Sequence, residues 1–281
     1  MASLPGFLGW FRASPQGTVG TDGRMALVDH FRELRARVLR SLVVLILCIV
    51  IAFFFYTEIR YVVTLPYHRA MEMLGQKTDS ELIVSGVGGP LLLQLKLCGL
   101  AGLLLSSPWW LAETWGFVLP ALHENERKWS YVFAAIAGPL FLFGVTVGYL
   151  TMPKALQVLI GFTPDYVKSL VDFNEYFSFL TRTLIVFGVS FEIPIFIVLL
   201  SLAGIIKGSQ LRQYRSWILV AVFVFAAVAT PSTDPFSMLF LAVPMAVLML
   251  ISEIIARIID KRRGRSRDLD PAWGDDEQSP L

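Results

Sequence analysis

FGVSFEIPIFIVLL, residues 187–200, is an apolar stretch that carries one carboxylate, Glu192, near its middle. The surrounding run, Tyr176–Leu202, is long enough for a helix to cross a bilayer. A charged group at the centre of such a helix costs roughly 2.5–3.5 kcal/mol on insertion. Glu192 is therefore predicted to be functional in the membrane or to have a partner there.

Five other apolar runs accompany this stretch, and the composition is that of a membrane protein. The chain of 281 residues is 55% hydrophobic and only 16% charged, a balance that excludes a soluble domain of this size. Its net charge of +2 gives no reason to expect a nucleic acid partner. The six runs are Leu39–Tyr56, Leu91–Leu119, Trp129–Leu150, Tyr176–Leu202, Ser216–Ala229 and Phe236–Ile251.

The six runs differ in length. The first four are long enough to cross a hydrocarbon core of ~30 Å, because a helix rises ~1.5 Å per residue. The fifth and sixth predict short helices of only ~21–24 Å, which would thin the membrane around them. The connection between these two, TPSTDP at Thr230–Pro235, leaves two arrangements open: one re-entrant hairpin, or two complete short spans.

The distribution of lysine and arginine predicts the orientation. With six spans and both termini inside, seventeen of these cations lie inside, five lie outside and two lie within spans. This excess follows the positive-inside rule. A hairpin would leave the basic tail on the same side, so charge alone does not exclude it. Asp234 and the lack of cations at the turn favour an external tip.

Prolines occur in or beside several runs and predict bent helices. Bent helices with exposed polar backbone usually line a concavity rather than face lipid. The expected fold is an all-α membrane protein, a bent concave bundle of six transmembrane helices with both termini cytoplasmic. Residues 1–26 are expected to form a flexible cytoplasmic extension, residues 27–257 the membrane domain and residues 258–281 a disordered cytoplasmic tail.

No feature of the sequence predicts an enzyme, a metal site or a bound cofactor. Cys48 and Cys98 lie within apolar runs and are expected to be free thiols. His123 and Glu124 begin like the H-E-x-x-H zinc motif, but Arg127 occupies the place of its second histidine. GVGGP in the first external loop lacks the lysine of a phosphate-binding loop.

Two acidic residues stand out on the predicted cytoplasmic face, where cations predominate. Glu33 precedes Arg37 by one helical turn, and such an i,i+4 pair contributes only ~0.2–0.5 kcal/mol. Glu126, in the loop PALHENERKW, has an equally plain explanation, since an acid favours the N-terminus of the next helix. The alternative is that both carboxylates, at the rim of the bundle, bind planar guanidinium groups in a bidentate geometry that lysine does not reproduce.

Seven segments together resemble the hallmark segments of the TatC family, the polytopic subunit of the twin-arginine protein translocase. They occur in the family's order between about Leu27 and Arg257, and HxxELRxR, PALxxxER and FGxxFExP are highly specific in combination. The segments are HFRELRARVL, LPYHRAM, LLLQLKL, WGFVLPALHENERK, LFLFGVTVGYLTMPKAL, FGVSFEIPI and ATPSTDPFSM.

The resemblance implies a six-helix receptor in the cytoplasmic membrane that recognises the paired arginines in signal peptides of folded cargo proteins. Glu33 and Glu126 match the two acids associated with this recognition. Arg35 and Phe117 match an arginine and an aromatic residue of the same segments. Glu192 matches the membrane-embedded glutamate of the family, which is expected to face the cavity and to hold water or a polar partner.

The resemblance also implies partners. Pro66 matches the proline of the first external loop, and Thr230 and Asp234 match polar positions near the docking place of single-span TatA or TatB subunits. Met238 and Glu113 each replace a common glutamine, so packing is expected to replace a polar contact at Met238, and Glu113 adds a third acid. Membrane lipids and further copies of the chain are other expected partners. Export is expected to use the proton-motive force rather than a nucleotide.

Two other kinds of membrane protein explain less of the sequence. A secondary transporter for a small solute would use Glu192 as a proton relay, but the two halves of the chain lack the similarity of inverted repeats. An intramembrane protease needs a serine–histidine dyad or paired aspartates at membrane depth, whereas all three histidines lie outside the apolar runs.

Overall fold

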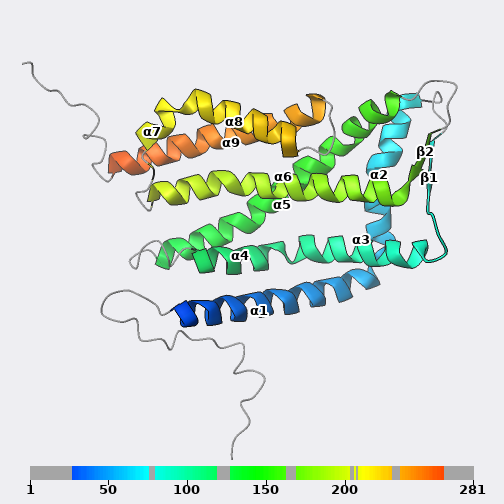
Figure 1. Cartoon of the computed structure of the whole chain (residues 1–281), viewed down its shortest axis with the longest axis horizontal. Coiled ribbons are helices and arrows are strands. Elements are labelled where there is room, and N and C mark those ends of the chain that lie inside the picture. The colour runs from blue at the N-terminus through cyan, green and yellow to red at the C-terminus, as the bar shows by residue number, and fades with distance from the viewer. Residues whose placement is uncertain are drawn as a thin grey trace, which may run out of the picture. The chain divides into compact units, whose positions relative to one another are not determined.

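The computed structural model describes residues 27–75, 80–118, 127–162, 169–202, 206, 208–229 and 235–262. These residues form nine helices and one two-stranded sheet (Figure 1). The elements are α1 (Leu27–Phe54), α2 (Tyr56–Leu74), β1 (Ser80–Ile83), α3 (Gly89–Leu105), α4 (Ser107–Val118), α5 (Arg127–Gly161), β2 (Ser169–Asp172), α6 (Phe173–Leu202), α7 (Gly208–Gln213), α8 (Arg215–Ala229) and α9 (Pro235–Arg262). Apart from the small sheet, the predicted all-α class is confirmed.

Among the described residues, each predicted apolar run is almost entirely helical. Four helices contain a stretch long and apolar enough to span a membrane: Phe31–Phe54, Ala135–Gly161, Phe173–Ser201 and Met238–Lys261. Helices α3 and α4 meet this criterion together and are bent by 52° at their junction, whereas α8 is an apolar helix of only 15 residues. The chain is therefore a multi-pass membrane protein.

The bend between α3 and α4 has a local cause in Pro108. A proline has no amide proton, so the carbonyl of Leu104, four residues earlier, loses its helical donor. The hydroxyl of Ser107 donates to this carbonyl instead, over 2.7 Å. Ser106 and Ser107 are both buried, and the Ser106 hydroxyl donates to the carbonyl of Leu103 over 3.1 Å. The bend predicted from the prolines is confirmed at this junction.

The described residues divide into two compact units, and the first of them ends at Val189. In this unit α1 runs antiparallel to α3 and α4, because Ile49 lies beside Gly102 whereas Arg37 lies beside Glu113. A Cβ on Gly102 would lie only 2.9 Å from the Cα of Ile49. Glycine at this position therefore lets α1 and α3 approach closely, as small residues do between membrane helices. Helix α4 packs in turn against α5, and α5 against α2.

Helix α2 lies in the segment predicted as the first external loop, and it was not predicted as a helix. Its buried residues include Val63, Tyr67 and Ala70, which are spaced i, i+4, i+7 and so lie on one face. Charged residues such as Glu58 and Arg60 interrupt the apolar run, so the segment fails as a membrane span while it satisfies the pattern of an amphipathic helix.

A short parallel sheet joins β1 to β2, with Ser80 opposite Ser169 and Ile83 opposite Asp172. Four-residue strands are too short for an alternating pattern to be recognised, and neither strand was predicted. Because β1 precedes α3 and β2 follows α5, an even number of membrane crossings must separate two strands that meet. The sheet therefore favours one crossing by the bent α3–α4 pair and one by α5.

Asp172, the last residue of β2, also caps α6. Its Oδ1 accepts a hydrogen bond from the backbone N–H of Asn174 over 2.7 Å, and the hydroxyl of Ser85 donates to Oδ2. These bonds, that of Ser85 above all, lower the pKa of Asp172 below its ordinary value. Lys96 of α3 donates to the side-chain oxygen of Asn174 over 2.9 Å, which connects α3 to the start of α6.

The second unit, from Ser190 onwards, contains the end of α6 together with α7, α8 and α9. Glu253 of α9 is buried and accepts two hydrogen bonds from Arg215 of α8, at 2.9 and 2.7 Å, and another from Arg257. The backbone N–H of Gly208 in α7 donates to Asp260 over 2.5 Å. These bonds hold α7 and the start of α8 against the end of α9.

Helix α9 is longer than predicted. The sixth apolar run ends at Ile251, but the helix continues to Arg262 because Ile254, Ile255 and Ile258 keep the helical spacing between charged residues. Its 28 residues extend ~42 Å, enough for a complete crossing. The prediction of a short sixth helix is therefore wrong, whereas α8, of 15 residues and ~22 Å, is as short as predicted.

Candidate functional site

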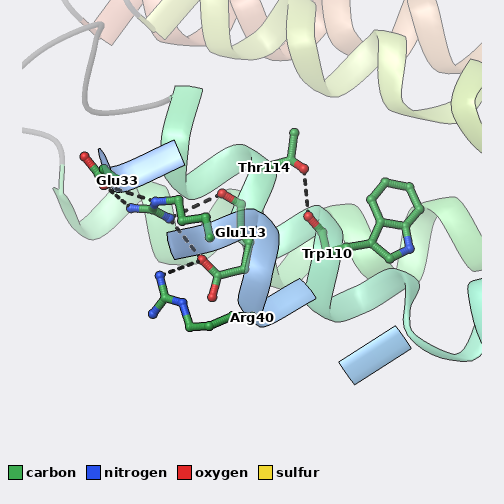
Figure 2. A network of polar contacts seen from close by, with 6 residues as sticks. Glu33, Arg40, Trp110, Glu113 and Thr114 are labelled. Atoms are coloured by element: carbon green, nitrogen blue, oxygen red, sulfur yellow. Dashed lines mark hydrogen bonds and ion pairs between the residues drawn. The ribbon is translucent and has the colours of Figure 1, made fainter. Parts of the chain in front are cut away.

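Glu33 lies on α1, and its carboxylate binds the guanidinium group of Arg37 one turn later (Figure 2). Nε of Arg37 donates to Oε1 over 3.0 Å, and Nη2 donates to the same oxygen over 2.6 Å. The pair is partly buried, since 28% of the Glu33 side chain and 20% of the Arg37 side chain are exposed. The predicted i,i+4 pair is confirmed, and Glu33 binds a guanidinium group in the folded chain.

Glu113 of α4 extends this site across the interface between two helices. Its Oε2 accepts hydrogen bonds from Nη1 of Arg37 over 3.3 Å and from Nη2 of Arg40 over 3.2 Å. Arg37 also donates to the backbone carbonyl of Glu113 over 3.3 Å. Glu33, Arg37, Arg40 and Glu113, which we call the α1–α4 network, combine two carboxylates with two guanidinium groups (Figure 2).

Gly116 of α4 provides the space for this network. A Cβ on this residue would lie only 2.5 Å from Nη1 of Arg37. The guanidinium group therefore lies against the helix backbone, one turn from Glu113, where any larger side chain would displace it. The glycine of the segment WGF thus has a definite steric role.

Phe117 and Arg35 lie near the α1–α4 network in sequence. Phe117 is half-buried and follows Glu113 by one turn of α4, whereas Arg35 is exposed on α1. Glu126 lies outside the described residues, so its approach to Glu33 stays a prediction.

Pro66 lies inside α2 and takes no part in the α1–α4 network. Because it has no amide proton, it leaves the carbonyl of Val62 without its helical donor. The hydroxyl of Tyr149 on α5 donates to this carbonyl over 2.7 Å, and the hydroxyl of Tyr176 on α6 donates to the next one, that of Val63. Two tyrosines therefore satisfy the backbone that the proline disturbs, which supports a structural role for Pro66.

Glu192 lies in the part of α6 that belongs to the second unit, and only 9% of the residue is exposed. Its neighbours Ser190 and Phe191 are fully buried. Two residues further on, the carbonyl of Pro194 accepts a hydrogen bond from the hydroxyl of Ser252 on α9, over 3.1 Å. Glu192 is thus buried, the position expected of an intramembrane acid that does not face lipid.

The predicted docking residues are only partly described. Thr230 and Asp234 lie outside the described residues. Met238 is half-buried in the first turns of α9, followed by the exposed Leu239 and Phe240. A docking role for these positions stays a prediction.

The α1–α4 network was not predicted, although the sequence carries a signal for three of its four residues. Glu33, Arg37 and Arg40 are spaced i, i+4, i+7 and therefore lie on one face of α1. Side chains on one face meet the same neighbour, which is α4. Glu113 was expected only as a third acid, because its pairing with α1 depends on helix packing that no local pattern encodes.

Comparisons with known proteins identify the family. The family model described as Sec-independent protein translocase protein (TatC) matches residues 29–244. Proteins of that name from Corynebacterium kroppenstedtii and Frankia casuarinae are 35% and 38% identical over 96% and 92% of this chain, and the matches cover 70% and 74% of those relatives. The protein of that name from Escherichia coli is 32% identical over 86% of this chain and 92% of its own length.

Solved structures agree with this assignment. A crystal structure of the twin-arginine translocase receptor TatC has a TM-score of 0.65 and 28% identity to this chain, and the match covers 82% of this chain and 98% of that one. A second, in DDM, has a TM-score of 0.66 and 29% identity over 81% and 99% of the two chains. The matched proteins are components of a protein translocase and so are transport proteins rather than classical enzymes. By sequence and by fold, the chain belongs to the TatC family of Sec-independent protein translocase proteins.

Proposed function

We propose that this chain is the receptor subunit of a twin-arginine translocase, in which Glu33 and Glu126 bind the two arginines of signal peptides on folded cargo proteins. One observation carries the proposal: the carboxylate of Glu33 binds a guanidinium group through two donors, at 3.0 and 2.6 Å. Arginine binding is thus within the chemistry of this position. The matched solved chains are described as twin-arginine translocase receptors, which supports the same role.

The proposed site lies on the cytoplasmic side of the cell membrane, with both termini of the chain on that side. The support is the excess of lysine and arginine in the segments assigned to the inside. Arg35 and Phe117 belong to the binding surface, Phe117 as an apolar contact beside the acids. The apolar part of the signal peptide then enters the membrane, where Glu192 provides a buried polar group.

Export itself needs further subunits and an energy source. Single-span partners of TatA or TatB type dock near Thr230, Asp234 and Met238, and several copies of the complex assemble. The short α8, ~22 Å long, thins the lipid around it, which eases the passage of cargo. The proton-motive force drives the step.

The proposed clamp, in which the carboxylates of Glu33 and Glu126 bind the two arginines of the signal peptide, is tested by reversing the charge of one of them. Glu126→Lys places an ammonium group where the proposal requires a carboxylate, so we expect crosslinking of a twin-arginine precursor to the chain to be lost. Because the change lies outside the predicted apolar runs, membrane insertion and abundance are expected to equal those of the parent chain. Crosslinking is measured with a photoreactive residue beside the arginine pair of the precursor.

Glu124→Lys is the matched control, since it makes the same charge change two residues earlier in the same loop. It is expected to retain most of the crosslinking. Unchanged crosslinking in Glu126→Lys, or equal loss in both variants, would contradict a specific clamp.

A further inference from the structure

The folded chain presents its own pair of arginines to its own acids. Arg37 and Arg40 lie on one face of α1, and they are bound by Glu33 and by Glu113 at 2.6, 3.3 and 3.2 Å (Figure 2). The chemistry matches that of the proposed ligand, two guanidinium groups from one peptide segment held by carboxylates. The network is also electrically balanced, with two negative and two positive groups.

We propose that Arg37 and Arg40 are internal competitors of the twin-arginine signal peptide, which binds by displacing them from Glu33 and Glu113. This inference rests on the proposed function and adds Glu113 to it as a further residue that determines specificity. In the absence of a signal peptide the two carboxylates are occupied by Arg37 and Arg40. With a signal peptide, its guanidinium groups replace Arg37 and Arg40 at these carboxylates, and Glu126 remains part of the binding site as proposed above.

Arg37 and Arg40 are bound unequally, and Arg40, the more weakly bound of the two, is the one that a signal peptide displaces more easily. Arg37 uses Nε, Nη1 and Nη2 in hydrogen bonds to Glu33 and Glu113. Arg40 has one bond, at 3.2 Å, and among the described residues its buried Nε makes no hydrogen bond. A guanidinium group that formed two parallel bonds to Glu113 would be held better than Arg40, so exchange at this carboxylate favours the signal peptide.

Discrimination against lysine comes from the direct bonds to the carboxylates and not from the competition itself. An incoming group has to bind the carboxylates better than the resident guanidinium groups do, and an ammonium group offers no planar fork for this. The cost of dehydrating the carboxylates does not help to discriminate, because they are already paired in the folded chain. The apparent affinity of any ligand falls in proportion to the fraction of sites that are unoccupied, so the resident arginines weaken the binding of every signal peptide by the same factor.

Two variants separate this inference from a purely structural network. Arg40→Gln removes the weakly held competitor. Gly116→Ala removes no charge, but its Cβ would lie 2.5 Å from Nη1 of Arg37 and so moves that group away from Glu113. The atom displaced is the end of a flexible side chain, and alanine favours helix, so α4 is expected to stay folded.

The experiment measures binding of a synthetic signal peptide to the full-length chain in detergent by fluorescence anisotropy. Peptides with twin arginine and with twin lysine are compared. We expect both variants to bind the twin-arginine peptide about two- to fivefold more tightly than the parent, the range of one partly exposed ion pair. Because an internal competitor weakens the binding of both peptides by the same factor, we expect the ratio between the affinities for the arginine and lysine peptides to stay unchanged. Arg212→Gln, which removes one exposed positive charge on α7, is the control and is expected to change neither quantity.

Each outcome has one meaning. If the parent chain binds the two peptides equally, the proposed receptor function fails. If the parent prefers arginine but neither variant binds more tightly, the competitor inference fails and the receptor function stands. If Arg40→Gln does not fold, Gly116→Ala decides alone, because it retains every charge of the network.

Discussion

At the scale of single residues, Glu113 determines the charge of the α1–α4 network. Its Oε2 accepts hydrogen bonds from both Arg37 and Arg40, and only 14% of its side chain is exposed. A glutamine at this position would leave two arginines against the single charge of Glu33. The third acid noted in the sequence thus balances the second arginine of α1 rather than making the surface more acidic.

Asp172 provides a prediction about pH. Because folding lowers its pKa, the carboxylate stabilises the fold above its ordinary pKa of about 3.9, and this stability is lost as the pH falls through the lowered value. Asp172→Asn removes the titration but keeps a residue that caps helices well. We therefore expect the Tm of the variant to depend less on pH between about 5 and 2 than that of the parent, as measured by thermal unfolding in detergent.

The comparison rests on the slope of Tm against pH and not on Tm at one pH. A variant whose slope equals that of the parent would show that the bonds from Ser85 and Asn174 contribute nothing measurable to stability.

At the scale of helices, Pro66 and Tyr149 allow a test of whether a side-chain hydroxyl replaces the helical hydrogen bond that a proline removes. The Tyr149 hydroxyl occupies the carbonyl that Pro66 leaves free, at 2.7 Å. Tyr149→Phe is expected to lower the free energy of unfolding by about 0.5–1.5 kcal/mol, the net contribution of one hydrogen bond. In a Pro66→Ala background the same change is expected to cost less, because the introduced alanine has an amide proton that reaches the carbonyl of Val62 itself.

Denaturant unfolding of the four chains of this double-mutant cycle provides the measurement. Tyr61→Phe serves as a control, because Tyr61 is exposed on α2 and is expected to tolerate the change. Equal costs of Tyr149→Phe in both backgrounds would show that the hydroxyl does not compensate for the proline.

Most of the helical framework was predictable from the sequence, and the failures have identifiable physical reasons. Apolar runs predict spans because lipid selects for them over about 18 or more residues. The pattern overlooks α2, whose buried face of Val63, Tyr67 and Ala70 is interrupted by charges. It also ends α9 at Ile251, since the remaining turns mix isoleucine with charged residues. The strands β1 and β2 were missed because their pairing joins segments far apart in the chain.

The candidate site was predictable only where it is local. Glu33 and its i,i+4 partner Arg37 follow from the sequence of α1. The contact of Arg37 with Glu113 depends on the way α1 crosses α4 over Gly116, and no pattern within either helix contains that information.

At the scale of the whole molecule, the orientation in the membrane gives a prediction that single cysteines can test. In a chain with Cys48 and Cys98 replaced by alanine, Val87→Cys is expected to react with a membrane-impermeant maleimide in intact cells. Gln213→Cys is expected to react only after permeabilisation, because it follows the lysine and arginine of the third inner segment. Both positions are exposed, so their difference reports sidedness rather than burial.

A third cysteine, Asp234→Cys, distinguishes two spans from a re-entrant hairpin. Labelling in intact cells is expected if α8 and α9 each cross the membrane, for which the 28 residues of α9 provide sufficient length. Labelling of Gln213→Cys in intact cells would contradict the orientation itself.

The pairing of β1 with β2 has a consequence for biogenesis. A ribosome delivers β1 long before β2, because the bent α3–α4 pair and α5 are translated between them. The backbone N–H and C=O groups of β1 therefore lack their partners in the sheet until α5 has been inserted across the membrane. The pairing of β1 with β2 is thus a late event in synthesis. It connects the two segments only after the bent α3–α4 pair and α5 have been inserted.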